Sequence, residues 1–176
     1  RRSSDLGRRG DRDYLYQMLR ASDSGAQARI QAVEALAMLK ENRMYRDKLW
    51  PLLISKHADD RVMGIRGMGA LGTQDARNAL LTMLKDDVPE VRLAAAGELG
   101  ELGSSAGRGL VYDYLNRNAS TMDQNTVGSL LATLAIGRIG GPELTQYLRD
   151  LLASQSDLIR LSAAQSRITS SGSGPY

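Results

Sequence analysis

Apolar residues along this chain recur at helical spacing in five segments of similar length. In each segment, apolar side chains stand one, seven and ten residues after an aligned first position, so they share one face of a helix. The fifth segment departs from this pattern, because Arg167 and Ser170 occupy two of its apolar positions. The segments recur every 31 to 37 residues, a period that predicts stacked units of two helices each. The aligned first positions are Arg29, Arg61, Arg92, Ser129 and Arg160.

Small residues occupy two further positions of the same helices. Three and eight residues after the aligned position, Ala or Gly replaces a larger apolar side chain in nearly every segment, which lets neighbouring helices approach closely. Gly72, Gly103 and Gly140 follow three of these helices where a positive φ would end the helix, a conformation that glycine adopts without a side-chain clash. The pattern therefore predicts both the packing face and the end of these helices.

A second amphipathic helix precedes each aligned segment. Apolar residues recur in these stretches at three- or four-residue spacing, and short polar turns connect the two helices of a pair. Pro89 and Pro142 stand near predicted helix starts, where a missing N–H costs little. The first helices are predicted at residues 13–21, 43–55, 76–85, 108–117 and 142–153. The repeat domain thus spans residues 13–170, between an Arg-rich tail at 1–12 and a Ser- and Gly-rich tail at 171–176.

The third segment carries the most specific motif. Residues 86–103, DDVPEVRLAAAGELGELG, resemble the consensus of HEAT repeats, particularly the short bacterial form that also occurs in phycobilisome-lyase-like proteins. The resemblance extends over about residues 13–170. It implies an all-α fold, a right-handed α-solenoid (superhelix) of about five two-helix HEAT-like repeats. In that family the helix with the Val-Arg pair lines the concave face.

The same resemblance implies a structural ladder, in which the aligned arginine of each repeat pairs with an Asp of a neighbouring repeat. Buried charges persist mainly when they are paired, so this role is favoured over the alternative, phosphate binding by the planar guanidinium groups. Ser129 interrupts the ladder in the fourth repeat, and altered packing is expected there. The ladder residues are Arg29, Arg61, Arg92 and Arg160.

Positive charge is concentrated at the N-terminus. The net charge is +3 and the pI is near 9.3, but the first twelve residues hold five arginines against two aspartates, and the rest of the chain has equal numbers of basic and acidic residues. A basic groove for nucleic acid along the solenoid is therefore not predicted. No apolar run reaches the length of a membrane span, so we expect a soluble domain, either cytoplasmic or exported after processing.

The residue types that carry most catalysis are scarce. The chain has no cysteine, which excludes disulfides and thiolate chemistry, and its single histidine, His57, is expected to be a solvated turn residue. HEAT-like hydroxylases hold iron with repeated His-Glu pairs, and this sequence contains no such pair. HEAT-like DNA glycosylases use a basic concave groove, which the neutral body does not provide. We therefore expect no catalytic residues, no metal and no cofactor, and thus a protein that is not an enzyme.

Binding of another protein is the role that this architecture favours. Five and nine residues after the aligned position, the predicted concave face has side chains of both signs, a mixture that suits a protein surface better than nucleic acid; a generic solvated face is the alternative. Exposed tyrosines and the longer fourth-repeat loop, residues 116–125, would add contacts, unless the loop is only a surface insertion. The candidate partner-binding residues are Glu34, Arg66, Glu101, Arg138, Tyr16, Tyr45, Tyr112 and Asn118.

The sequence therefore predicts a non-catalytic protein–protein interaction scaffold or adaptor, as a HEAT-repeat subunit of a larger assembly. Two alternatives remain: a lyase-type enzyme or accessory subunit, and nucleic-acid binding through the N-terminal Arg-rich arm. A pocket with convergent ionisable side chains would favour the first alternative, and loss of binding at raised salt would favour the second.

Overall fold

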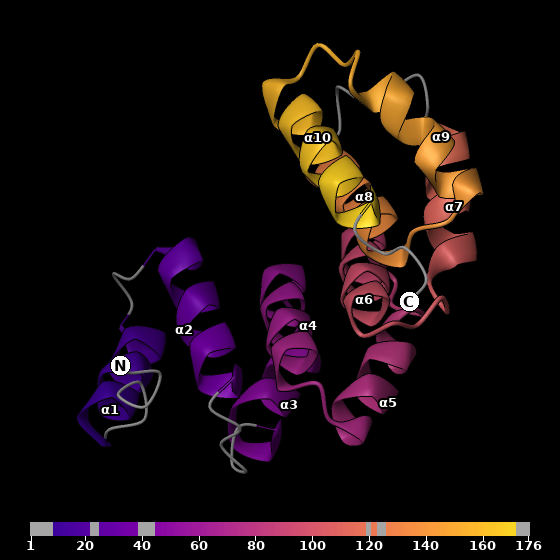
Figure 1. Cartoon of the computed structure of the whole chain (residues 1–176). Coiled ribbons are helices and arrows are strands. Elements are labelled where there is room, and N and C mark those ends of the chain that lie inside the picture. Colours follow the sequence, from indigo (N-terminus) through magenta and orange to yellow (C-terminus); the bar gives the residue numbers. More distant parts are fainter. Residues whose placement is uncertain (1–8, 22–24, 39–44, 119–120, 123–125, 172–176) are drawn as a thin grey trace.

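The computed structural model describes residues 9–21, 25–38, 45–118, 121–122 and 126–171. Within these ranges the regular structure is helical, and the helices form two layers (Figure 1). The inner layer consists of α2 (Ala26–Met38), α4 (Ala58–Leu71), α6 (Pro89–Glu101), α8 (Thr126–Ile139) and α10 (Asp157–Ser171). The outer layer consists of α1 (Arg9–Arg20), η1 (Tyr45–Leu49) with α3 (Trp50–Leu53), α5 (Gln74–Met83), α7 (Arg108–Asn118) and α9 (Pro142–Leu151). The predicted all-helical solenoid of five two-helix repeats is confirmed.

The inner helices pack side by side in chain order, α2 on α4, α4 on α6, α6 on α8 and α8 on α10. Each begins three residues before the aligned position of the sequence, so equivalent residues occupy equivalent places in all five repeats. The predicted apolar face forms the core: Leu36, Met68, Leu99 and Ile136 are at most 1% exposed. The inner helices form a curved row, and the outer helices all lie on one side of that row (Figure 1).

The outer helices attach to the inner layer through two apolar residues spaced four apart. Burying a large apolar side chain contributes about 1.5–3 kcal/mol, so one such pair holds a short helix against its neighbour. These buried pairs are Leu49 with Leu53, Ala76 with Leu80, Val111 with Leu115, and Leu144 with Leu148.

Two predicted helix boundaries differ from the structure. Helix α1 begins at Arg9, four residues before the predicted start at residue 13. The helix predicted at 43–55 is divided into a π-helical turn and the four-residue α3, because Pro51 has no N–H to continue the α-helical hydrogen bonds. The remaining outer helices differ from their predicted ranges by a few residues at their ends. Residues 1–8 and 172–176 lie outside the described ranges.

Glycine permits close contact between neighbouring inner helices. A Cβ atom on Gly100 would lie 2.8 Å from the backbone N of Ile139, so the separation of α6 and α8 requires the small residue that the pattern predicted. The predicted helix ends are also confirmed: the glycines with φ of 64°, 79° and 67° are Gly72, Gly103 and Gly140. Among the described residues, no helix is long and apolar enough to cross a membrane.

Candidate functional site

A recurring hydrogen bond connects the start of an inner helix to the turn before it. Arg61 Nη1 donates to the carbonyl oxygen of Ser55 at 2.9 Å. The same contact, to the carbonyl six residues earlier, recurs at Arg92 at 2.6 Å and at Arg160 at 2.7 Å. Because a buried carbonyl without a donor costs free energy, these arginines stabilise the turn between the outer and inner helices.

Ser129 replaces the arginine in the fourth repeat and satisfies the turn in another way. Its side chain is fully buried, and its Oγ donates to the carbonyl oxygen of Met122 at 2.6 Å. Thr133 Oγ1 in turn donates to the carbonyl oxygen of Ser129 at 2.7 Å. The altered packing expected at Ser129 is therefore a buried hydrogen-bonded contact, in which a short side chain reaches a nearer carbonyl.

Arg61 also forms an ion pair with the next repeat. Its Nε lies 2.8 Å from Asp86 Oδ2 and its Nη2 lies 2.9 Å from Asp86 Oδ1, with the two side chains 11% and 8% exposed. Burial tends to raise the pKa of Asp86, but hydrogen bonds from Arg61 and from the Val88 N–H outweigh it, so this pKa lies below its ordinary value. The pair connects the second and third repeats.

The predicted ladder is confirmed at Arg61 and is not continuous in the described part of the chain. For Arg29, the residue of the next repeat that corresponds to Asp86 is Ser55. Arg29 therefore has no carboxylate partner at that position. The corresponding position for Arg92 is 123, which lies outside the described residues. Within the described residues, Arg160 pairs with Asp157 of its own helix. The family-like pairing therefore depends on an Asp two residues before the helix N-cap.

The inner helices carry two clusters of opposite charges. Arg66 Nη1 of α4 lies 3.6 Å from Glu34 Oε1 of α2. Arg138 of α8 contacts two carboxylates of α6, Glu98 Oε1 at 2.6 Å and Glu101 Oε2 at 3.5 Å. Four predicted partner-binding residues are thus brought together as interhelical ion pairs. Their charges are largely matched within the chain, so this face offers little unbalanced charge to a partner.

Glu98 was not among the predicted residues, yet it is the buried member of the second cluster. Its carboxylate packs on Gly69 of α4, where an added Cβ would lie 2.2 Å from Glu98 Oε2. Burial raises the pKa of Glu98, although the positive charge and hydrogen bond of Arg138 act in the opposite direction. A signal was present in the sequence: the equivalent residues of the other repeats are all small, namely Ala35, Gly67, Ala135 and Ser166.

The outer aromatic residues are unevenly exposed. Tyr112 is 40% exposed, as predicted, and its ring meets that of Tyr147 edge-on with centroids 6.0 Å apart. The predicted exposure of Tyr16 is wrong, because this residue is half-buried against the core, whereas Tyr14 is 63% exposed. The side chain of Tyr45 lies outside the described residues.

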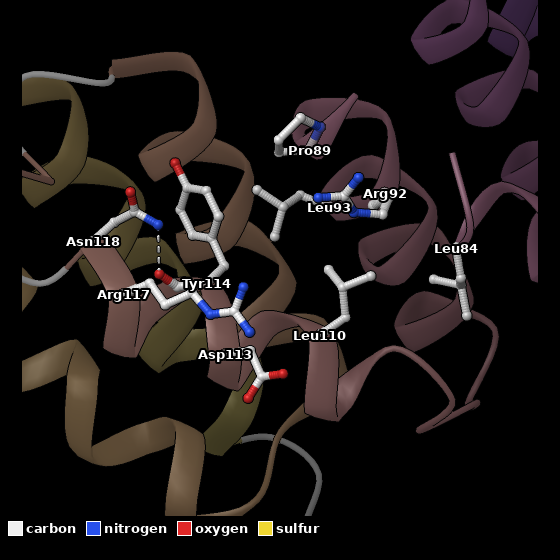
Figure 2. A pocket seen from close by; sticks show the side chains of 9 residues that line it. All are labelled: Leu84, Pro89, Arg92, Leu93, Leu110, Asp113, Tyr114, Arg117 and Asn118. Atoms are coloured by element: carbon white, nitrogen blue, oxygen red, sulfur yellow. Dashed lines mark hydrogen bonds between the residues drawn. The ribbon is translucent and has the colours of Figure 1, made fainter. Parts of the chain in front are cut away.

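A pocket of about 610 Å³ opens between the third and fourth repeats (Figure 2). Its apolar residues come from the C-cap of α5, the first turns of α6 and the start of α7. One face of α7 supplies most of the remaining wall, with residues at three- and four-residue spacing. The lining residues are Leu84, Pro89, Arg92, Leu93, Leu110, Asp113, Tyr114, Arg117 and Asn118.

The polar groups of the pocket are held in place by the backbone. Arg92 Nη1 donates to the carbonyl oxygens of residues 86 and 87, which fixes its guanidinium at the rim. Asn118 Nδ2 donates to the carbonyl oxygen of Tyr114 at 2.8 Å, and the Tyr114 ring lies between Asn118 and Leu93 (Figure 2). Burial, followed by the charge of Glu90, raises the pKa of Tyr114, so the phenol stays protonated. The pocket therefore combines apolar residues with hydrogen-bond donors of both neutral and cationic kinds.

The pocket includes Asn118, a predicted partner-binding residue, and Arg92, a predicted ladder residue. Asn118 was predicted to lie in the longer loop, but it is the last residue of α7. Sequence reasoning did not find the other lining residues, because they meet only through the spacing of α6 and α7. Among the described residues, no three His, Asp or Glu side chains gather as a metal site.

Comparison with known proteins agrees with the geometry of the repeats. The family model described as HEAT repeats matches residues 46–127, from η1 to the start of α8. A chain in the solved complex of CpcE and CpcF of phycocyanin lyase from Nostoc sp. PCC7120 has a similar fold, with a TM-score of 0.60 and 21% identity. The similarity covers 96% of this chain and 68% of that chain, and at this identity it shows the fold alone. No curated protein sequence matches the chain.

Proposed function

We propose that this chain, a HEAT-repeat protein, is a non-catalytic scaffold that binds another protein through the pocket between α5, α6 and α7. One observation carries the proposal: the pocket at the junction of two repeats is lined by apolar residues, including the buried Leu93, together with polar groups of both signs. Protein interfaces combine a buried apolar centre with a polar rim in this way. The apolar residues would accept an apolar side chain of the partner, and the rim would orient the segment that carries it.

The rim favours a partner segment with an acidic residue beside its apolar anchor. Arg117 stands exposed in the last turn of α7, and Arg92 presents its fixed guanidinium from α6. Guanidinium groups pair with carboxylates in a bidentate geometry, which adds orientation to affinity. Asp113 gives the rim one charge of the opposite sign, so the partner is not expected to be strongly acidic overall.

Capture from an extract of the source cells tests this proposal. The purified chain is immobilised, and retained proteins are identified by mass spectrometry with and without nuclease, at low and at high salt. A specific protein that survives both treatments and is lost with Arg117→Glu would support the pocket. The matched control is Arg149→Glu, which alters the equivalent last turn of the outer helix α9. Retention that is equal in both variants would reject the pocket as the binding surface.

A lyase-type subunit is the second candidate, and two observations favour it. The fold similarity to a chain of the phycocyanin lyase complex covers 96% of this chain, and the pocket contains ionisable side chains. The chemistry of those side chains favours binding over catalysis. A general acid or base works best with a pKa near the working pH, whereas burial raises the pKa of Tyr114 further above neutrality. Recovery of phycocyanin in the capture experiment would favour the lyase-type role.

Nucleic-acid binding through the N-terminal Arg-rich arm is tested by the same experiment. Most of that arm lies outside the described residues, and only residues 9–12 fall within α1. Binding to phosphate groups weakens steeply as salt is raised. Retained material that disappears after nuclease treatment and at high salt would therefore replace the scaffold proposal with this one.

A further inference from the structure

The pocket lies where the length of the repeat changes. The aligned positions of the second and third repeats are 31 residues apart, and those of the third and fourth are 37 apart. At the first junction, α5 ends at Met83 and the turn that follows brings Asp86 to Arg61 of the preceding repeat. At the second junction, α7 continues as a helix to Asn118. The additional helical residues extend the wall that α7 gives to the pocket.

One face of α7 lines the pocket along most of the helix. Five residues at three- and four-residue spacing lie on this face. At a rise of 1.5 Å per residue they cover about 12 Å of the helix axis, slightly more than two turns. They are Leu110, Asp113, Tyr114, Arg117 and Asn118. The wall is therefore the side of a helix, a surface on which a second helix can pack.

The wall suits an occupant that satisfies its own backbone hydrogen bonds. Between the ends of α7, its backbone N–H and C=O groups bond within the helix, so the wall offers a partner only side chains. Within the described residues no strand edge lies beside the pocket, so an extended segment would leave many of its own backbone groups without partners. An α-helix has no such requirement, and the wall therefore favours a helical occupant.

Two opposite charges stand one turn apart on the same face of α7. Asp113 and Arg117 are both exposed, and within the described part of the chain neither forms an ion pair. Figure 2 shows both on the same side of the pocket. Residues four apart are neighbours on any α-helix, so a second helix can place one charge against each of them. The complementary pattern is a basic residue against Asp113 and an acidic residue against Arg117.

We propose that the pocket binds an amphipathic helix of the partner protein, packed along α7 with its apolar side chains against Leu84, Leu110 and Tyr114. An acidic and a basic residue, one turn apart beside its apolar face, contact Arg117 and Asp113. This inference rests on the proposed binding function of the pocket and adds the conformation and charge pattern of the bound segment. Packing of an amphipathic helix into an apolar groove is a recurrent mode of protein recognition.

Synthetic helices test this occupant. The first peptide is a stapled helix of about 15 residues, with leucines along one face and a Glu and a Lys four residues apart beside them. The second peptide has Lys at both charged positions. Fluorescence anisotropy should show that the wild-type chain binds the first peptide at least ten-fold more tightly, and this preference should reverse for Arg117→Glu. Arg149→Glu, at the end of α9, should keep the wild-type preference. Circular dichroism checks that both variants are folded.

A third peptide, unstapled and with proline at its centre, distinguishes a helical from an extended occupant, because proline breaks the helix. Equal binding of the first and third peptides, a charge preference that does not reverse, or no binding of the first peptide would overturn the helical occupant. If a captured protein is still lost with Arg117→Glu in that case, the proposed function of the pocket stands without the helix. If capture is also insensitive to Arg117→Glu, both proposals are rejected.

Discussion

The guanidinium of Arg61 and the carboxylate of Asp86 meet through two parallel contacts, Nε to Oδ2 at 2.8 Å and Nη2 to Oδ1 at 2.9 Å. The same guanidinium donates to the carbonyl oxygen of Ser55, so one arginine joins its own turn to the turn of the next repeat. This arrangement links two adjacent repeats directly. In a repeat array each repeat contacts mainly the adjacent ones, so such links stabilise the array.

Removing Asp86 should destabilise the chain strongly. Asp86→Ala leaves a nearly buried guanidinium without its main partner and removes an acceptor for the Val88 N–H. Breaking such a pair costs about 3–5 kcal/mol, and we expect about 3 kcal/mol because Asp87 remains nearby. Urea unfolding followed by circular dichroism measures the change.

The control for this prediction is Asp87→Ala. Asp87 lies 3.2 Å from the same guanidinium, but its side chain is 90% exposed. Exposed ion pairs contribute at most about 1 kcal/mol, so the control should change stability far less. Equal effects of the two substitutions would show that the burial of Asp86 does not determine its contribution to the free energy of unfolding.

Glu98 should make the stability depend on pH in an unusual direction. Its pKa is raised in the folded chain, so the folded state binds a proton more readily than the unfolded state. Between the unfolded and folded pKa values, this group therefore adds stability as the pH falls. An ordinary carboxylate with a lowered pKa, such as Asp86, loses its contribution on acidification instead.

Comparison of the wild-type chain with Glu98→Gln isolates this effect. The stability of the variant relative to the wild type should fall as the pH drops from neutral through the folded pKa, because the wild-type carboxyl becomes neutral as well. Urea unfolding of both chains across this pH range measures the difference. If the stability of the variant relative to the wild type stayed constant or rose on acidification, the raised pKa of Glu98 would be contradicted.

Gly100→Ala should disrupt the contact between α6 and α8. The added Cβ would lie 2.8 Å from the backbone N of Ile139, so the helices must separate. Overpacking of this kind typically costs about 1–3 kcal/mol. Gly109→Ala is the matched control in α7, where a Cβ has no atom within 4 Å, and it should stabilise the chain by about 0.5–1 kcal/mol. Thermal unfolding distinguishes the opposite signs.

The inner helices were predictable because their apolar and small positions repeat in register. Pro51 shows where a local rule competed with the pattern, since the periodic apolar spacing predicted one helix and the missing N–H divided it. Glu98 was detectable in principle as the one charged residue among small equivalents. The pocket was not, because Leu93 and Tyr114 come together only through the separation of α6 and α7, which no local spacing determines.

The affinity of the captured partner for two charge-reversal variants tests the central claim most directly. Arg117→Glu places a carboxylate at the pocket rim, and Arg149→Glu makes the same change at the end of α9. Binding measured by calorimetry should weaken at least ten-fold, about 1.4 kcal/mol, for Arg117→Glu and remain unchanged for Arg149→Glu. If both variants bind as tightly as the wild type, the pocket between α5, α6 and α7 is not the partner site.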